Sequence, residues 1–136
     1  MRSISAIKSR YYAIARLLGA PAKHITFATQ PRHDGGPHVE RDGDAYYYVV
    51  SERGHELERR VTGDPEELLY WLVSDLASAM ASEYELAHRR VGEDSRRQLF
   101  DKHVELLALA NGSWSQRKRA EYDELLRSYP FSDSQA

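Results

Sequence analysis

Between residues 38 and 62 the side chains alternate with a period of two, and this segment limits the possible folds more than any other. Asp42-Gly43 and Arg53-Gly54 are turn signals on either side of a tyrosine-rich strand. Alternate residues of that strand share a face, and one of its faces consists of Tyr46, Tyr48 and Val50. The segment therefore predicts a three-stranded antiparallel β-meander.

The third strand of this meander is expected to separate apolar from charged side chains. Strict alternation places one set on the same face, namely His55, Leu57, Arg59 and Val61. The opposite face then carries Glu56, Glu58 and Arg60. We therefore expect a sheet with one apolar face and one charged face.

The rest of the chain has helical periodicity. Residues 3–18 place a stripe of apolar side chains at spacings of three and four: Ile4, Ile7, Tyr11, Ile14 and Leu18. Residues 19–37 are rich in proline and glycine and predict a loop whose only strand-like piece is residues 25–27. Asp64-Pro65 is a strong helix start, and we expect a broadly apolar helix from 64 to about 89.

Two further helices are predicted after a turn near residues 91–94. The first carries Leu99, Phe100, Leu106 and Leu107, and Asn111-Gly112 ends it. The last runs from about 114 to 128. The predicted fold class is α+β: a three-stranded antiparallel meander packed with about four α-helices, including a central antiparallel helix hairpin. We expect one domain over 1–136, with an N-terminal helix (1–18), the meander (38–62) and a helical part (64–128).

Composition excludes several classes of protein. Hydrophobic residues make up 41% and charged residues 29%, which is typical of a soluble globular domain. The chain contains no cysteine, so disulfides, cysteine nucleophiles and thiolate metal sites are excluded. No window is long and apolar enough to predict a membrane span, and Lys8, Arg10 and Arg16 interrupt the N-terminal stretch where a signal peptide would be apolar. The cytoplasm is the expected location.

Known catalytic motifs are missing from the sequence. There is no phosphate-binding loop, nucleophile elbow or dinucleotide fingerprint, so no cofactor is expected. His55-Glu56 does not extend to a zinc motif, because Arg59 stands where the second histidine would be needed, and no metal is expected. The tyrosine strand has many acidic neighbours, which would repel phosphate. We therefore expect no nucleic-acid partner.

One pair of residues suggests chemistry. Glu83 and His103 lie on the apolar stripes of two successive predicted helices, almost equally far from the turn between them. An antiparallel hairpin of these helices would bring the two side chains to the same level. A carboxylate and an imidazole so placed could act as an acid–base pair, or they could fix the register of the hairpin as a structural polar pair. We favour the structural interpretation, because no nucleophile or metal cluster accompanies the pair.

Six short segments resemble a known family by their order and spacing. They are E-R-G-x-E-L-E-R-R at 52–60, D-x-x-E-L-L-Y-W at 64–71, M-A-S-E-Y-E-L at 80–86, D-x-R-R-x-L-F at 94–100, W-x-x-R-x-x-x-E at 114–121 and Y-P-F at 129–131. The chain resembles the bacterial polymorphic-toxin immunity proteins grouped as immunity protein 63 over about residues 38–131. The resemblance implies a small cytoplasmic α+β protein, not an enzyme, that binds and neutralises a cognate toxin domain. It also suggests that Arg53, Gly54, Glu56, Trp71 and Glu83 determine the fold.

The charge pattern suggests which surface such a protein would use. Residues 1–33 carry six basic side chains and no acid, whereas residues 64–88 carry six acids and no lysine or arginine. Acidic side chains could occupy a basic cleft of a toxin and accelerate association. The candidate partner-binding residues are Asp42, Asp44, Glu66, Glu67 and Asp75. The sequence leaves the oligomeric state open, and it leaves two alternative functions: a small enzyme using Glu83 and His103, and an adaptor whose exposed tyrosines bind a protein or ligand.

Overall fold

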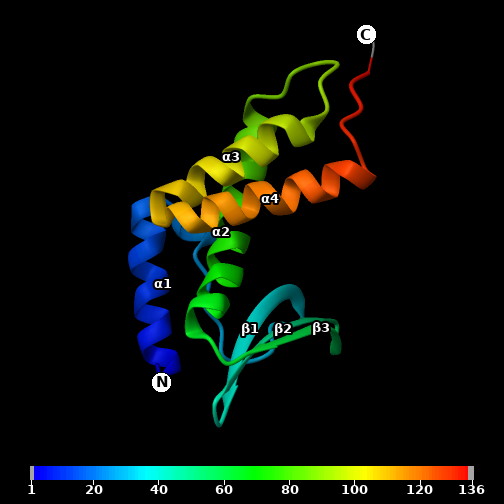
Figure 1. The fold of residues 1–136 in the computed structure, drawn as a ribbon. Helices are drawn as coiled ribbons and strands as arrows, with labels where there is room; N and C mark the ends of the chain where they lie inside the picture. The colour runs from blue at the N-terminus through cyan, green and yellow to red at the C-terminus, as the bar shows by residue number, and fades with distance from the viewer. Residues whose placement is uncertain (1, 135–136) are drawn as a thin grey trace. The chain divides into compact units, whose positions relative to one another are not determined.

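One helix, a three-stranded sheet and three further helices follow one another in the computed structural model, which describes residues 2–134 (Figure 1). The first helix, α1 (Ile4–Leu18), leads through a single helical turn, η1 (Ala22–His24), to the sheet. The strands are β1 (Asp34–Asp42), β2 (Ala45–Glu52) and β3 (His55–Thr62). The remaining helices are α2 (Pro65–Ala87), α3 (Ser95–Ala110) and α4 (Gly112–Ser128). The predicted α+β class and the meander are confirmed.

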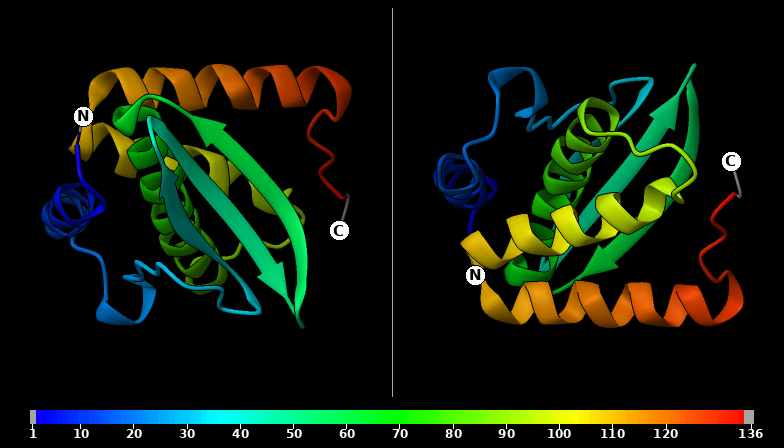
Figure 2. Two further views of the ribbon diagram at one scale, coloured as in Figure 1. Left: turned by 90° about the horizontal axis from the view of Figure 1, so that it is seen from below. Right: turned by 90° about the horizontal axis from the view of Figure 1, so that it is seen from above.

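The sheet has the order β1-β2-β3, and both pairs of strands are antiparallel (Figure 2). Tyr46 and Tyr48 of β2 are almost fully buried on the face that meets the start of α2, where the rings of Tyr48 and Trp71 lie 6.0 Å apart. The turn between β2 and β3 places both Arg53 and Gly54 at positive φ. Gly54 adopts this conformation without a steric penalty, which explains a glycine at this position.

The separation of charges predicted for β3 is wrong, and a β-bulge is one reason. Val50 pairs with Glu58 and Ser51 with Glu56, so Leu57 is an extra residue in β3. The bulge puts Glu56 on the same face as Arg59, to which it is hydrogen-bonded at 2.7 Å. The covered face is not purely apolar either, since Arg60 lies 4.6 Å above the ring of Tyr48. Leu57 and Val61 remain about 60% exposed.

The sheet also begins earlier than expected. Strand β1 starts at Asp34 rather than near residue 38, with an irregular register between Asp34 and Pro37. The strand-like piece at residues 25–27 lies outside every strand. It is held instead by isolated bonds, one from the Thr26 amide to the Tyr11 hydroxyl and one from the Val39 amide to the Ala28 carbonyl. These single contacts do not extend into a ladder.

Side-chain caps fix the starts of the later helices. Asp64 accepts a hydrogen bond from the Glu66 amide, which confirms the predicted start of α2. Asp94 caps α3 by accepting a bond from the Arg96 amide. Asn111 ends α3 and also caps α4 through the amides of Ser113 and Trp114. Helix α4 therefore starts two residues earlier than the sequence indicated.

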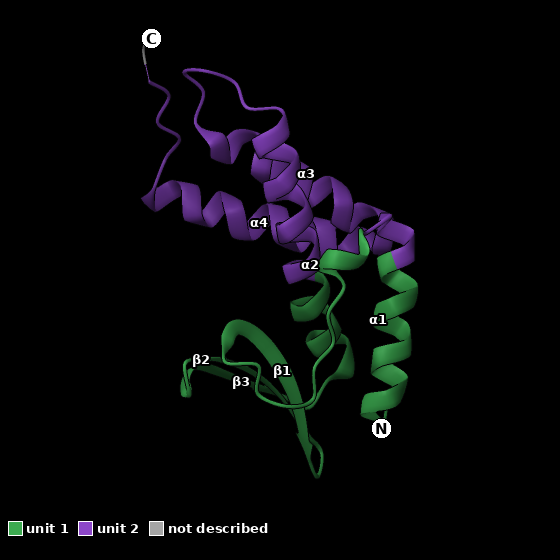
Figure 3. Ribbon diagram, turned by 180° about the vertical axis from the view of Figure 1, so that it is seen from behind, with its two compact units in different colours: residues 1–15, 21–73 green, residues 16–20, 74–136 purple. Residues whose placement is uncertain are grey.

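The chain forms two compact units (Figure 3). The first contains residues up to 15 together with 21–73, and its core includes Ile7, Tyr11, Ile14, Val39, Tyr46, Tyr48, Leu68, Leu69 and Val73. The second contains residues 16–20 together with those from 74 onward, and its core includes Leu76, Ala77, Ala81, Phe100, Leu106, Leu107 and Trp114. Within the second unit α3 and α4 run antiparallel beside each other, so the closely packed hairpin is α3–α4 (Figure 2).

Candidate functional site

His103 is the most deeply buried histidine of the second unit, with 3% of its surface exposed. Its Nε2 lies 3.3 Å from the Ser74 hydroxyl, and its Nδ1 contacts the Tyr122 hydroxyl. The Tyr122 ring is stacked on Phe100 with the ring centres 3.8 Å apart. A neutral imidazole offers one donor and one acceptor, so the two hydroxyl groups satisfy both ring nitrogens.

The surroundings of His103 favour the neutral ring. Burial, followed by the positive charge of Lys118, lowers the pKa of His103 to about 4, against an ordinary value of 6.5. Burial also raises the pKa of Tyr122 to about 12, with a contribution from Glu121. At neutral pH both groups are therefore uncharged. A histidine with so low a pKa is a weak base, which suits a structural hydrogen bond better than proton transfer.

The structure does not bring Glu83 to His103. Glu83 lies on the exposed side of α2, and His103 bonds to Ser74 and Tyr122 instead. The prediction assumed that α3 runs alongside α2, whereas α3 runs alongside α4. His103 therefore contacts Tyr122 of α4 and, on α2, Ser74 rather than Glu83. The buried acidic side chain in this part of α2 is Glu85, which is 3% exposed and accepts two hydrogen bonds from Arg89. This geometry removes the basis of the acid–base interpretation.

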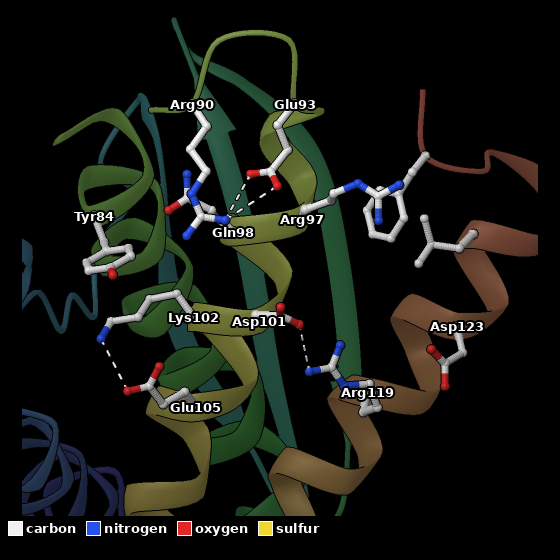
Figure 4. A pocket seen from close by; sticks show the side chains of 12 residues that line it. Tyr84, Arg90, Glu93, Arg97, Gln98, Asp101, Lys102, Glu105, Arg119 and Asp123 are labelled. Carbon is white, nitrogen blue, oxygen red and sulfur yellow. Dashed lines mark hydrogen bonds and ion pairs between the residues drawn. The ribbon is translucent and has the colours of Figure 1, made fainter. Parts of the chain in front are cut away.

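A polar pocket of about 410 Å³ lies in the second unit, between the end of α2, α3, α4 and the C-terminal tail (Figure 4). Six of its charged side chains form three ion pairs: Arg119 with Asp101 at 3.0 Å, Arg90 with Glu93 at 3.4 Å, and Lys102 with Glu105 at 3.4 Å. His103 is not among the lining residues. The pocket therefore has little net charge to attract an ion, and it gives no access to the buried histidine.

The C-terminal tail is hydrogen-bonded to the start of α3. The Asp94 carboxylate accepts a hydrogen bond from the Ser132 amide, and the Asp94 amide donates to Asp133. The Arg96 guanidinium donates to the carbonyls of Tyr129 and Pro130, at 2.9 and 2.8 Å. Hydrogen bonds from the Arg96 side chain and from the Ser132 and Arg96 amides hold the pKa of Asp94 well below its usual range. Two motifs far apart in the sequence, 94–100 and 129–131, thus meet in space.

Replacing Asp94 by alanine should release the tail. The variant loses both the cap of α3 and the acceptor for the Ser132 amide, so we expect hydrogen exchange at Ser132 to accelerate by at least about tenfold. Asp94→Asn is the matched comparison: Asp94 accepts these two bonds on separate oxygens, and asparagine has one oxygen, so we expect an intermediate exchange rate. Mass-spectrometric or NMR exchange measures the difference. Equal protection at Ser132 in the alanine variant and the wild type would contradict this account of the tail.

The outer face of the sheet, turned away from the start of α2, carries a small network around Arg59. The guanidinium lies 5.3 Å from the centre of the Tyr47 ring, 2.7 Å from Glu56 and 3.4 Å from Glu40. Glu40 also contacts Nε2 of the buried His38 at 2.6 Å, and this bond and Arg59 lower the pKa of Glu40. The His38 Nδ1 is buried without a hydrogen-bond partner within residues 2–134.

The tyrosines and the five acidic candidates have different environments. Of the tyrosines of β2, only Tyr47 is partly exposed, and it packs against Arg59; the adaptor hypothesis had required wide exposure without such packing. Asp42 and Asp44 are exposed in the β1–β2 turn, and no side-chain bond holds them within the described part of the chain. Glu66 is engaged by both Arg2 and Arg10. Glu67 also has an interaction within the fold, as does Asp75, which belongs to the second unit.

Sequence reasoning missed the residues that organise these sites. The contact of His103 with Tyr122 and the Asp94 tail contact depend on the α3–α4 pairing, which no local pattern specifies. The motifs 94–100 and 129–131 did mark the segments involved. Among residues 2–134, no group of three histidine, aspartate or glutamate side chains could hold a metal ion. None of the described helices is long and apolar enough to cross a membrane.

Comparison with known proteins identifies the class. The sequence matches the family model described as Immunity protein 63 over residues 42–124, from the β1–β2 turn to the last third of α4. Because the match spans more than half of the chain, this protein belongs to the immunity protein 63 family, and the family resemblance of its motifs is confirmed. Neither the curated proteins nor the solved structures provide a significant match.

Proposed function

We propose that this protein binds the toxin domain encoded beside it and neutralises that toxin by forming a stoichiometric complex inside the producing cell. Membership of an immunity protein family carries the proposal. The low pKa and the two hydrogen bonds of His103 argue against its use as a general base, which is consistent with this proposal. The toxin's activity is therefore blocked by occupancy and not by chemistry.

Co-expression with the neighbouring toxin domain tests this function. Cells that make the toxin domain alone should stop growing, and cells that also make this protein should grow. An affinity tag on the toxin domain should recover both chains in equal amounts. Growth rescue without any complex would contradict stoichiometric inhibition, and failure of both readouts would reject the proposed function.

Acidic side chains are proposed to guide the toxin to this protein. Asp42 and Asp44 lead the candidate set, because neither is engaged within the described fold. The ion pairs of Glu66 with Arg2 and Arg10 suggest that its first role is in stability. Glu67 and Asp75 complete the proposed set. Long-range attraction of this kind acts mainly on the rate of association and weakens as salt is added.

Neutralising the turn should therefore slow association. We expect the double variant Asp42→Asn, Asp44→Asn to lower the association rate constant by at least about threefold at low salt and to weaken its salt dependence. The matched control is Asp123→Asn with Glu124→Gln, which removes the same charge from α4. Surface plasmon resonance at several salt concentrations measures both effects. If the two double variants behave alike, the turn does not steer the toxin.

A further inference from the structure

Two large apolar side chains of β3 are open to solvent. Leu57 is 60% exposed at the bulge and Val61 is 59% exposed near the end of the strand. Val61 pairs with Tyr47 across the sheet, on the outer face, and Tyr47 is partly exposed there. Water would surround these apolar side chains in the free protein, and an exposed apolar patch framed by polar groups is a common mark of a protein contact surface.

The aromatic part of this patch is held in place. Arg59 lies over the Tyr47 ring, and its guanidinium is fixed by Glu56 on one side and Glu40 on the other. These contacts limit the rotamers that Tyr47 can adopt before any partner arrives. A prearranged aromatic side chain beside an exposed valine lowers the entropy cost of binding.

Charge around the patch indicates the chemistry of its partner. Residues 34–62 contain seven acids and four arginines, which gives the sheet a net charge of −3. The free acids Asp42 and Asp44 lie at the same end of the sheet as Tyr47 and Val61, since Asp42 pairs with Ala45, and Gly63 after β3 lies beside the Asp44 carbonyl. A complementary surface would present an apolar centre surrounded by lysine or arginine.

The patch suits contact with the face of the sheet rather than addition of a strand. Strand β3 is an edge strand, but its bulge at Leu57 interrupts the regular spacing that a new strand would need. Charged side chains also occur on both faces of this edge strand, with Glu56 and Arg59 on one face and Arg60 on the other. Both features discourage pairing between strand edges.

We propose that the outer face of the sheet around Tyr47 and Val61, with the acidic β1–β2 turn beside it, is the surface that docks on a basic, partly apolar face of the toxin domain. This assignment rests on the proposed function and specifies where the partner binds. Val61 fills the centre of the contact, Tyr47 lies beside it, and Asp42 and Asp44 form an acidic rim. The polar pocket of the second unit plays no part in this contact.

The test replaces Val61 by lysine and measures binding to the neighbouring toxin domain by calorimetry. Loss of the apolar contact together with repulsion from a basic partner should raise Kd by about 30-fold or more. Leu109→Lys is the matched control, because Leu109 is 56% exposed on α3 and the substitution changes charge equally. It should leave Kd within about threefold of the wild type. Val61→Thr keeps the shape of the side chain and should have an intermediate effect.

The outcomes separate this assignment from the proposed function. Thermal unfolding of each variant first establishes that it is folded. If the wild type binds the toxin domain and Val61→Lys binds equally well, the docking surface is wrong while the immunity function stands. If the wild type itself does not bind, the proposed function fails. If the protein dimerises on its own and Val61→Lys abolishes the dimer, the patch is an interface between two copies, and the assignment to the toxin is overturned.

Discussion

Replacing Tyr46 by alanine is expected to lower the free energy of unfolding by about 3–5 kcal/mol, the largest effect of any single substitution considered. Tyr46 is fully buried in the first unit, where its hydroxyl donates to the Arg2 carbonyl and Arg41 lies over its ring. Alanine would leave a cavity beneath the sheet and remove one of the two donors to the Arg2 carbonyl, which Arg41 also contacts. Urea denaturation followed by circular dichroism measures the loss.

Two control variants separate packing from hydrogen bonding at this site. Tyr46→Phe keeps the ring and removes only the hydroxyl, so we expect it to cost about 1 kcal/mol. Val61→Ala removes exposed apolar atoms from the neighbouring strand and should change stability by less than about 0.5 kcal/mol. A Tyr46→Ala variant as stable as Val61→Ala would show that Tyr46 does not anchor the sheet.

Acidification from pH 7 to pH 5 is expected to destabilise the protein by about 2 kcal/mol through His103 alone. Its folded-state pKa of about 4 lies below the ordinary 6.5, so between these values the unfolded chain binds a proton that the folded chain does not. The contribution of His103 to the free energy of unfolding is fully present above pH 6.5 and decreases as pH falls towards 4. Denaturation curves at a series of pH values measure the slope.

The variant His103→Gln identifies the source of this pH dependence. Glutamine is neutral throughout the range and has both a donor and an acceptor for the Ser74 and Tyr122 hydroxyls. Between pH 7 and pH 5 the free energy of unfolding of this variant should fall by about 2 kcal/mol less than that of the wild type. If wild type and variant lose stability in parallel, another group governs the acid response and the buried neutral histidine is not its cause.

Local signals in the sequence predicted local structure well. Asp64-Pro65 specified the start of α2, and alternation correctly grouped Tyr46 with Tyr48 on one face of β2. The faces of β3 could not be predicted, because a bulge depends on how two strands pair and not on either strand alone. The bulge accounts for the position of Leu57, whereas Val61 lies in the regular part of the strand, where its pairing with Tyr47 places it on the outer face. Val61, at the centre of the proposed docking face, is thus a residue that alternation had grouped with the apolar face.

The contacts of the candidate site were harder to predict, because they also depend on which elements lie side by side. The apolar stripe of α3 correctly indicated that His103 is buried, but its partner depends on which helix lies alongside. Sequence adjacency favoured Glu83 of α2, whereas the partners are Ser74, at another level of α2, and Tyr122 of α4, the helix that runs alongside α3. Family motifs gave better guidance, since 94–100 and 129–131 mark two segments that contact each other through Asp94 and Arg96.

We propose that this protein inhibits a toxin domain by forming a complex with it. The most direct measurement is titration of the purified toxin domain with this protein, with the toxin's activity and the mass of the complex followed together by light scattering. We predict that activity disappears when the two chains are equimolar and that a one-to-one heterodimer accounts for all of the toxin domain. Loss of activity at far less than one equivalent, or full activity with excess protein, would contradict stoichiometric inhibition.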